Sequence, residues 1–159
     1  GHAAFKENYF LDDGAYLAVR LLIKMAQLRK KGKSLTSLIE DLKKPLEAKE
    51  VRLRFSCDDF ADYGGYIISE LGKVCEELAP SGVCRPADDN REGIRVTVPA
   101  EQGWFLARMS VHDPIMVVNF ESDKIGGTNG LAAFLHAYMS QYSAVDSTPL
   151  QALAAQAQR

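Results

Sequence analysis

The chain has 159 residues, 47% hydrophobic and 25% charged, which suits one domain, or one small domain and part of another. Its formal net charge of −2 argues against nucleic acid as a partner, and no apolar run is long enough for a membrane span. The three cysteines (Cys57, Cys75, Cys84) lack CxxC spacing, which argues against a disulfide framework or zinc site and predicts a cytoplasmic location.

The first predicted element is a helix that begins after Asp12 and Asp13 and ends at Gly32. We interpret the two acids as helix caps rather than metal ligands, because carboxylates favour the positive end of a helix. A second, shorter helix is predicted over residues 35–42 and stops before Pro45. Both helices need a partner for their apolar faces, so residues 1–45 are interpreted as the tail of a domain.

A second region, residues 46–142, begins within a predicted linker, PLEAKE, at residues 45–50. Alternating apolar residues predict strands over 51–55 and 94–98, and the apolar runs at 104–109 and 115–122 predict two more, with Trp104 in the core. Apolar residues at helical spacing predict one helix after Asp59 and a closing helix that carries Leu131 and Leu135. The order β-α-β-β-β-α predicts an α+β domain, a sheet with helices on one face. Residues 143–159 lack a sustained pattern and are expected to be a flexible tail.

The segment RMSVHDPIM, residues 108–116, contains the richest local chemistry. A Ser-His-Asp triad is disfavoured, because residues in one tight turn rarely place an imidazole between a hydroxyl and a carboxylate. Two interpretations stay open. Arg108, Ser110 and the turn amides could bind an oxyanion, or the segment could be a plain polar hairpin, which local chemistry alone favours. His2, one residue from the start, has no local context that assigns it a role.

Two longer stretches resemble the α-D-phosphohexomutases, the phosphomannomutase/phosphoglucomutase family. In the family, a Gly-Glu-x-Ser-Gly-His loop leads into Phe-Lys-Glu and then into Asp-Asp-Gly at a helix start; Gly1 and His2, residues 5–7 and residues 12–14 match these elements in order. In REGIRVTVPAEQGWFLARMSVHDP, the strand, the Gly-Trp pair and the Arg-x-Ser loop are similar to the family's last domain, which contains a phosphate-binding loop.

The resemblance implies that residues 1–45 are the tail of the third, sugar-binding α/β domain. Residues 46–142 would be the fourth domain, an antiparallel sheet with helices on one face, similar to the TATA-box-binding protein. The four-domain enzymes interconvert hexose 1-phosphates and 6-phosphates of glucose or mannose through a bisphosphorylated intermediate. Their phosphoserine and Mg²⁺ motifs lie upstream, so this chain alone is expected to be inactive and to hold no metal.

The same resemblance assigns the site residues. Arg108, Ser110, Val111 and His112 would bind the substrate phosphate that is not transferred, and His2 would contact the sugar or assist proton transfer. The family has Gly or Asn and then Thr where this chain has Val111 and His112. Val111 disfavours a positive φ, so a tight nest of amides is harder to form. This departure keeps open a non-catalytic sugar-phosphate-binding or regulatory relative as the alternative.

Overall fold

The computed structural model describes residues 3–156, and the chain divides into two compact units between Lys44 and Pro45. Unit 1 comprises residues 1–44 and unit 2 residues 45–159, so this division lies one residue from the predicted domain boundary. None of the helices in the described part of the chain is both long and apolar enough to cross a membrane.

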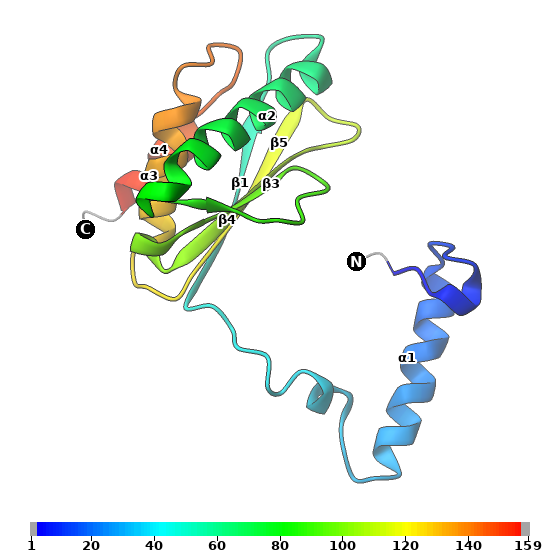
Figure 1. Ribbon diagram of the computed structural model, residues 1–159. Coiled ribbons are helices and arrows are strands. Elements are labelled where there is room, and N and C mark those ends of the chain that lie inside the picture. Colours follow the sequence, from blue (N-terminus) through cyan, green and yellow to red (C-terminus); the bar gives the residue numbers. More distant parts are fainter. Residues whose placement is uncertain (1–2, 157–159) are drawn as a thin grey trace. The chain divides into compact units, whose positions relative to one another are not determined.

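Unit 1 consists of a short 3-10 helix η1 (Lys6–Asn8), the helix α1 (Gly14–Arg29) and a second 3-10 helix η2 (Leu35–Leu38) (Figure 1). Asp13 is the N-cap of α1, and its Oδ1 accepts the Tyr16 backbone N–H at 2.9 Å. The interpretation of this acid as a cap is therefore confirmed. Within α1, only Leu28 is buried.

The second predicted helix is shorter than expected. Its α-helical pattern over residues 35–42 forms only the 3-10 turn η2, and Ile39 and Leu42 are 62% and 69% exposed. A helix of about two turns is marginal unless tertiary packing covers its apolar face, and these side chains have no such cover.

Unit 2 contains a five-stranded antiparallel sheet in the order β1-β5-β4-β3-β2. Its strands are β1 (Glu47–Arg54), β2 (Arg85–Pro86), β3 (Ile94–Val98), β4 (Gly103–Met109) and β5 (Ile115–Ser122). Its helices are α2 (Phe60–Leu78), η3 (Ala79–Ser81), η4 (Pro99–Glu101), α3 (Gly127–Met139) and α4 (Thr148–Ala155). The helices α2 and α3 cover one face of the sheet (Figure 1), and a single hydrophobic core fills the space between. The predicted α+β class is confirmed.

Period-2 alternation sorts the strand residues onto two faces. In β3, Ile94, Val96 and Val98 are buried, whereas Arg95 and Thr97 are exposed. The face away from the helices, called here the open face, carries the side chains of the exposed set. Trp104 was predicted to lie in the core, and this is wrong. Its register partner Thr97 lies on the open face, and the Arg95 guanidinium stacks over its ring at 4.5 Å.

Three further expectations need correction. Most of the predicted linker PLEAKE is strand, because β1 begins at Glu47, which pairs with Ser122 of β5. The two-residue strand β2 was missed, since only its pairing with β3 defines it. Residues 148–155 of the expected flexible tail form α4, with Leu150 and Leu153 buried. Two apolar residues at helical spacing, one turn of a helix, form too short a pattern to predict a helix from the sequence.

Candidate functional site

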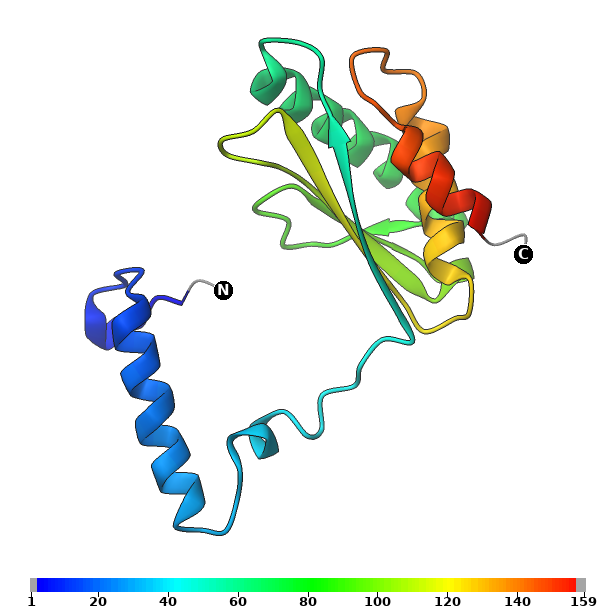
Figure 2. The same cartoon turned by 180° about the vertical axis from the view of Figure 1, so that it is seen from behind.

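The connection between β4 and β5 forms a turn closed by its own hydrogen bonds. The Ser110 N–H donates to the Ile115 carbonyl at 2.8 Å, and the Asp113 N–H donates to Ser110 Oγ at 3.3 Å. Across from the turn, the Phe55 N–H donates to the Pro114 carbonyl at 2.9 Å. The turn is thus anchored on both sides, and the end of β1 lies beside it; Figure 2 shows both at the same end of the sheet.

Two consecutive amides of this turn have no acceptor. Within the described residues, neither the Val111 N–H nor the His112 N–H makes a hydrogen bond. Both residues are exposed, Val111 to 84%. The non-glycine residues with positive φ in the described part of the chain are Tyr9, Phe10 and Gln102, so Val111 does not adopt the left-handed conformation that an alternating nest requires. The two donors are available to an anion in solvent.

The residues of the disfavoured triad lie close in sequence without a catalytic arrangement. No hydrogen bond among the described residues joins His112 to Ser110 or to Asp113, and all of residues 111–114 are exposed. Ser110 Oγ instead accepts a backbone N–H of the same turn. The hydroxyl proton of Ser110 remains free to donate, as a phosphate ligand needs.

Arg108 points onto the open face of the sheet, one register step before the turn. It pairs with Val117 of β5, which pairs in turn with Arg52 of β1, so both guanidinium groups lie on this face on either side of Val117. Within the described chain, Arg108 forms no ion pair or hydrogen bond. Its charge nevertheless contributes to lowering the pKa of Glu50.

Glu50 is the principal counter-charge on this part of the face. Its Oε1 accepts the Arg52 Nε–H at 3.0 Å, and its Oε2 accepts the Asn119 side-chain amide at 3.2 Å. These two donors, Arg52 first, hold the pKa of the Glu50 carboxyl below its ordinary value, with a smaller contribution from Arg108. Arg52 is therefore engaged, whereas Arg108 keeps its hydrogen-bonding capacity.

Arg52 and Arg54 were not among the predicted site residues. The alternation in VRLRF does predict that its basic residues lie opposite its apolar ones. It does not reveal that β1 pairs with β5 along its whole length and ends beside the turn, because that pairing joins residues more than 60 positions apart in the chain. His2, the remaining predicted site residue, lies outside the described residues.

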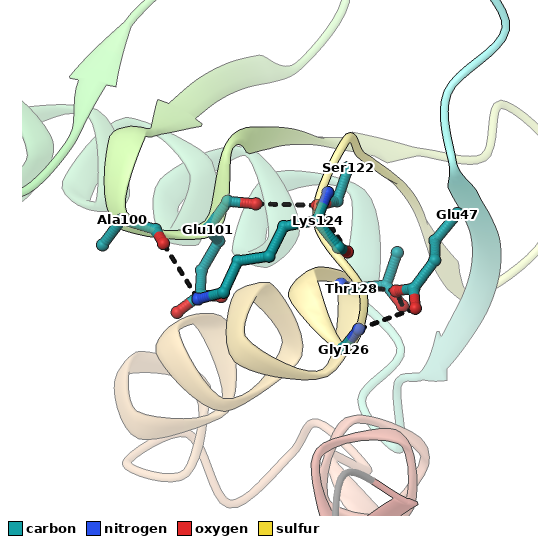
Figure 3. A network of polar contacts seen from close by, with 7 residues as sticks. All are labelled: Glu47, Ala100, Glu101, Ser122, Lys124, Gly126 and Thr128. Atoms are coloured by element: carbon teal, nitrogen blue, oxygen red, sulfur yellow. Dashed lines mark hydrogen bonds and ion pairs between the residues drawn. The ribbon is translucent and has the colours of Figure 1, made fainter.

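A second polar cluster surrounds the start of α3 (Figure 3). Ser122 Oγ donates to the Glu101 carbonyl at 2.7 Å and accepts the Lys124 N–H at 2.9 Å, while Lys124 Nζ forms an ion pair with Glu101 at 2.9 Å. Glu47 accepts the N–H groups of Gly126 and Thr128. Because each of these groups has a protein partner, the cluster is structural and ties the beginning of β1 to α3.

The described residues contain no group of three or more His, Cys, Asp and Glu side chains placed to hold a metal ion. Of the carboxylates on this side of unit 2, Glu50 is committed to Arg52 and Asn119, Asp146 accepts the Thr148 N–H, and Asp113 is exposed in the turn itself. These residues do not fit a magnesium site. The chemistry available at the turn is anion binding, by a guanidinium, a hydroxyl and two amides.

Comparison with known proteins relates this chain to one enzyme family. It is 28% identical over 142 residues to a phosphomannomutase/phosphoglucomutase of Pseudomonas syringae pv. tomato, covering 89% of this chain and 27% of that protein. It is 28% identical over 150 residues to one of Pseudomonas aeruginosa, covering 93% of this chain and 28% of that protein. The chain thus spans little more than a quarter of the length of these relatives. No protein-family profile matches it.

Among solved structures, a phosphoglucomutase/phosphomannomutase family protein from Burkholderia thailandensis has a similar fold. The TM-score is 0.58 at 23% identity, and the match covers 91% of this chain and 28% of the other. At this identity the likeness concerns the fold. Together with the sequence relatives, it confirms the predicted resemblance to the phosphomannomutase/phosphoglucomutase family.

Proposed function

We propose that this chain, as a relative of the phosphohexomutases, is the phosphate-binding part of an enzyme that interconverts hexose 1-phosphates and hexose 6-phosphates. In this proposal, unit 2 is the C-terminal domain, and unit 1 is the tail of the sugar-binding domain. The exposed apolar residues of α1, including Val19 and Leu22 at 53% and 58%, support that assignment of unit 1, because a larger domain would cover them.

The observation that carries the proposal is the set of free donors at the β4–β5 turn. Arg108 lies on the open face with no hydrogen-bond partner among the described residues. Two positions later, Ser110 presents its hydroxyl, and the next two amides lack acceptors. A guanidinium fork, a hydroxyl and consecutive N–H groups form charge-assisted hydrogen bonds with phosphate oxygens. A plain polar hairpin would not require this combination.

Binding the phosphate that is not transferred contributes to catalysis at a distance. Phosphoryl transfer depends mainly on positioning and on electrostatic stabilisation of a loose transition state. Contacts to the remote phosphate supply binding energy that orients the reacting end of the sugar. Arg108 binds the phosphate through its guanidinium. Ser110 donates a hydrogen bond to a phosphate oxygen and does not act as a nucleophile, and the two backbone amides restrict the position of the phosphate. The bisphosphorylated intermediate must reorient between half-reactions, and a site of exposed donors accepts either end.

In the same proposal, the phosphoserine and the Mg²⁺ that supports transfer belong to other parts of the enzyme, and the isolated chain is inactive. His2 would contact the sugar or assist proton transfer. Three free cysteines, two of them buried, fit a reducing cytoplasm. The substrate would be a phosphate of glucose or mannose. Both sugars are named because the residues that distinguish them lie outside the described site.

The first test is the affinity of the full chain for glucose 1-phosphate, followed by NMR titration. Because Arg108 carries the only fork of donors in the set, we expect Arg108→Ala to weaken binding about tenfold, the value of one charge-assisted hydrogen bond. Arg91→Ala removes an exposed arginine from a different loop and should leave the affinity within about twofold. Equal affinities of the Arg108 variant and the wild type would contradict the phosphate site.

The substitutions at Val111 and His112 favour a second candidate, a relative that binds sugar phosphate without mutase chemistry. The two candidates differ in turnover rather than in binding. An assay of glucose 1-phosphate conversion by the natural polypeptide that carries this sequence distinguishes them. Conversion that falls with Arg108→Ala supports the enzyme, and binding without conversion supports the non-catalytic relative.

A further inference from the structure

The register of the sheet brings a second arginine to the phosphate turn. Arg54 pairs with Ile115, and the Ser110 N–H donates to the Ile115 carbonyl. Arg54 and Ser110 therefore flank Ile115 on the same face, as Arg52 and Arg108 flank Val117 one register step away. With strands about 4.8 Å apart, their Cα atoms are roughly 10 Å apart. An extended arginine side chain covers more than half of that distance.

The arginine side chain is positioned on the open face by its neighbours. Leu53 and Phe55, on either side of it in β1 and just after, are buried, whereas Arg54 is exposed. The Phe55 N–H bonds to the Pro114 carbonyl, so the backbone of β1 stays attached to the turn up to this point. The Arg54 carbonyl accepts the Asp146 N–H at 2.9 Å, which holds the other edge of the strand.

Among the described residues, none forms a hydrogen bond or ion pair with the guanidinium of Arg54. The carboxylate of Asp146, whose backbone N–H donates to the Arg54 carbonyl, accepts the Thr148 N–H at 3.0 Å at the start of α4. Thr148 is the main cause of the lowered pKa of Asp146, and Arg54 makes the smallest contribution. By contrast, Arg52 on the same strand and face is held by Glu50 at 3.0 Å. The two arginines thus differ in whether a carboxylate already binds the guanidinium: Glu50 binds that of Arg52, and no described carboxylate forms an ion pair with that of Arg54.

We propose that Arg54 is a second cationic ligand of the phosphate, binding it from the side of β1 while Arg108, Ser110 and the turn amides bind it from β4. This inference rests on the proposed function and extends its site by one residue. A dianionic phosphate carries more charge than Arg108 alone neutralises, and the carboxylates of Glu50 and Asp113 oppose it. A second guanidinium on the other side of Ile115 offsets that repulsion.

The experiment compares three charge-removing variants of the full chain: Arg54→Gln, Arg108→Gln and, as the matched control, Arg52→Gln. Affinity is measured by NMR titration with inorganic phosphate and with glucose 1-phosphate, and the Arg Nε–Hε signals report which guanidinium binds. We expect Arg54→Gln to weaken phosphate binding by about five- to tenfold, and Arg52→Gln by less than about twofold. Arg54→Lys should restore part of the affinity, since it keeps the charge and loses the fork.

The outcomes separate this inference from the proposed function. If Arg108→Gln weakens binding while Arg54→Gln matches Arg52→Gln, the inference is wrong and the proposed function stands. Equal losses in the Arg54 and Arg52 variants would indicate a diffuse electrostatic effect and would also overturn it. If the wild-type chain binds neither ligand, both fall. Arg54 is exposed, and a thermal melt of each variant checks that folding is unchanged.

Discussion

A single carboxylate, that of Glu47, links the first residue of β1 to the start of α3. Glu47 accepts the N–H groups of Gly126 at 2.7 Å and Thr128 at 3.1 Å, and its second oxygen also accepts the Thr128 hydroxyl at 2.8 Å. The first turn of a helix leaves such amides without partners, and a negative charge there also interacts favourably with the helix dipole. A residue from the other end of unit 2 therefore caps α3.

We expect Glu47→Gln to lower the free energy of unfolding by about 1 kcal/mol at pH 7, since it removes the charge from these hydrogen bonds. The Gly126 amide, with Thr128, holds the pKa of Glu47 below its ordinary value of 4.5. A lowered pKa in the folded state means that the stabilisation is fully present above pH 4.5 and is lost as the pH falls through the lowered value. Urea titrations at pH 7 and pH 3 measure both effects.

The control for this prediction is Asp89→Asn, which neutralises an exposed carboxylate in the loop before β3. It should change the free energy of unfolding by less than about 0.5 kcal/mol at either pH. A Glu47 variant that loses as much stability at pH 3 as at pH 7 would show that packing, rather than the charge, is responsible.

Among the elements, α4 is the one most at odds with its sequence. Its Ala- and Gln-rich composition predicts a tail, but Leu150 and Leu153 are buried, and the Asn129 side-chain amide donates to the Leu153 carbonyl at 2.6 Å. The helix packs on α3 and β1, so α4 closes the core that β1 opens. Short helices of this kind owe their stability to tertiary contacts.

Leu150→Ala tests whether α4 is part of the core. Leu150 is fully buried, so we expect a loss of about 2 to 4 kcal/mol in the free energy of unfolding, from the lost transfer energy and the cavity. Gln151→Ala, at the exposed neighbouring position, should change stability by less than about 0.5 kcal/mol. Denaturant titration of both variants gives the comparison. A Leu150 variant as stable as the control would restore the interpretation of a flexible tail.

At the scale of the whole molecule, the hydrophobic core belongs to one unit. Every residue of the core cluster, from Leu53 in β1 to Leu153 in α4, lies in unit 2. Unit 1 has a single buried apolar residue among those described, Leu28. A unit of this size with its own core meets the physical criteria for an independently folding domain.

We therefore expect residues 45–159, expressed alone, to fold cooperatively, with a melting temperature within about 5 °C of the main transition of the full chain. Dispersed amide signals in an NMR spectrum would demonstrate the fold, and differential scanning calorimetry gives the transition. A collapsed spectrum, or a transition lowered by much more than this, would mean that unit 1 contributes to the stability of unit 2.

The sequence by itself determined the element types of unit 2 wherever a pattern was long. The alternation of IRVTV and the apolar run of IMVVNFES predicted β3 and β5, and apolar spacing predicted the buried face of α2, including Ile67, Leu71 and Cys75. These patterns depend only on local geometry, the period of a strand or a helix. The helix cap at Asp13 was predicted for the same reason. The family motifs, in order along the chain, indicated the phosphate turn.

Only the tertiary structure decided what surrounds that turn. Pairing of β1 with β5 places Arg54 across Ile115 from Ser110 and extends β1 back to Glu47, and pairing of β4 with β3 and β5 leaves Trp104 on the open face. Such pairings join residues far apart in sequence, and a shift of one residue would exchange the two faces, so no local pattern specifies them. The turn was visible in the sequence, whereas the arginine proposed to complete its phosphate site follows from the register of the sheet.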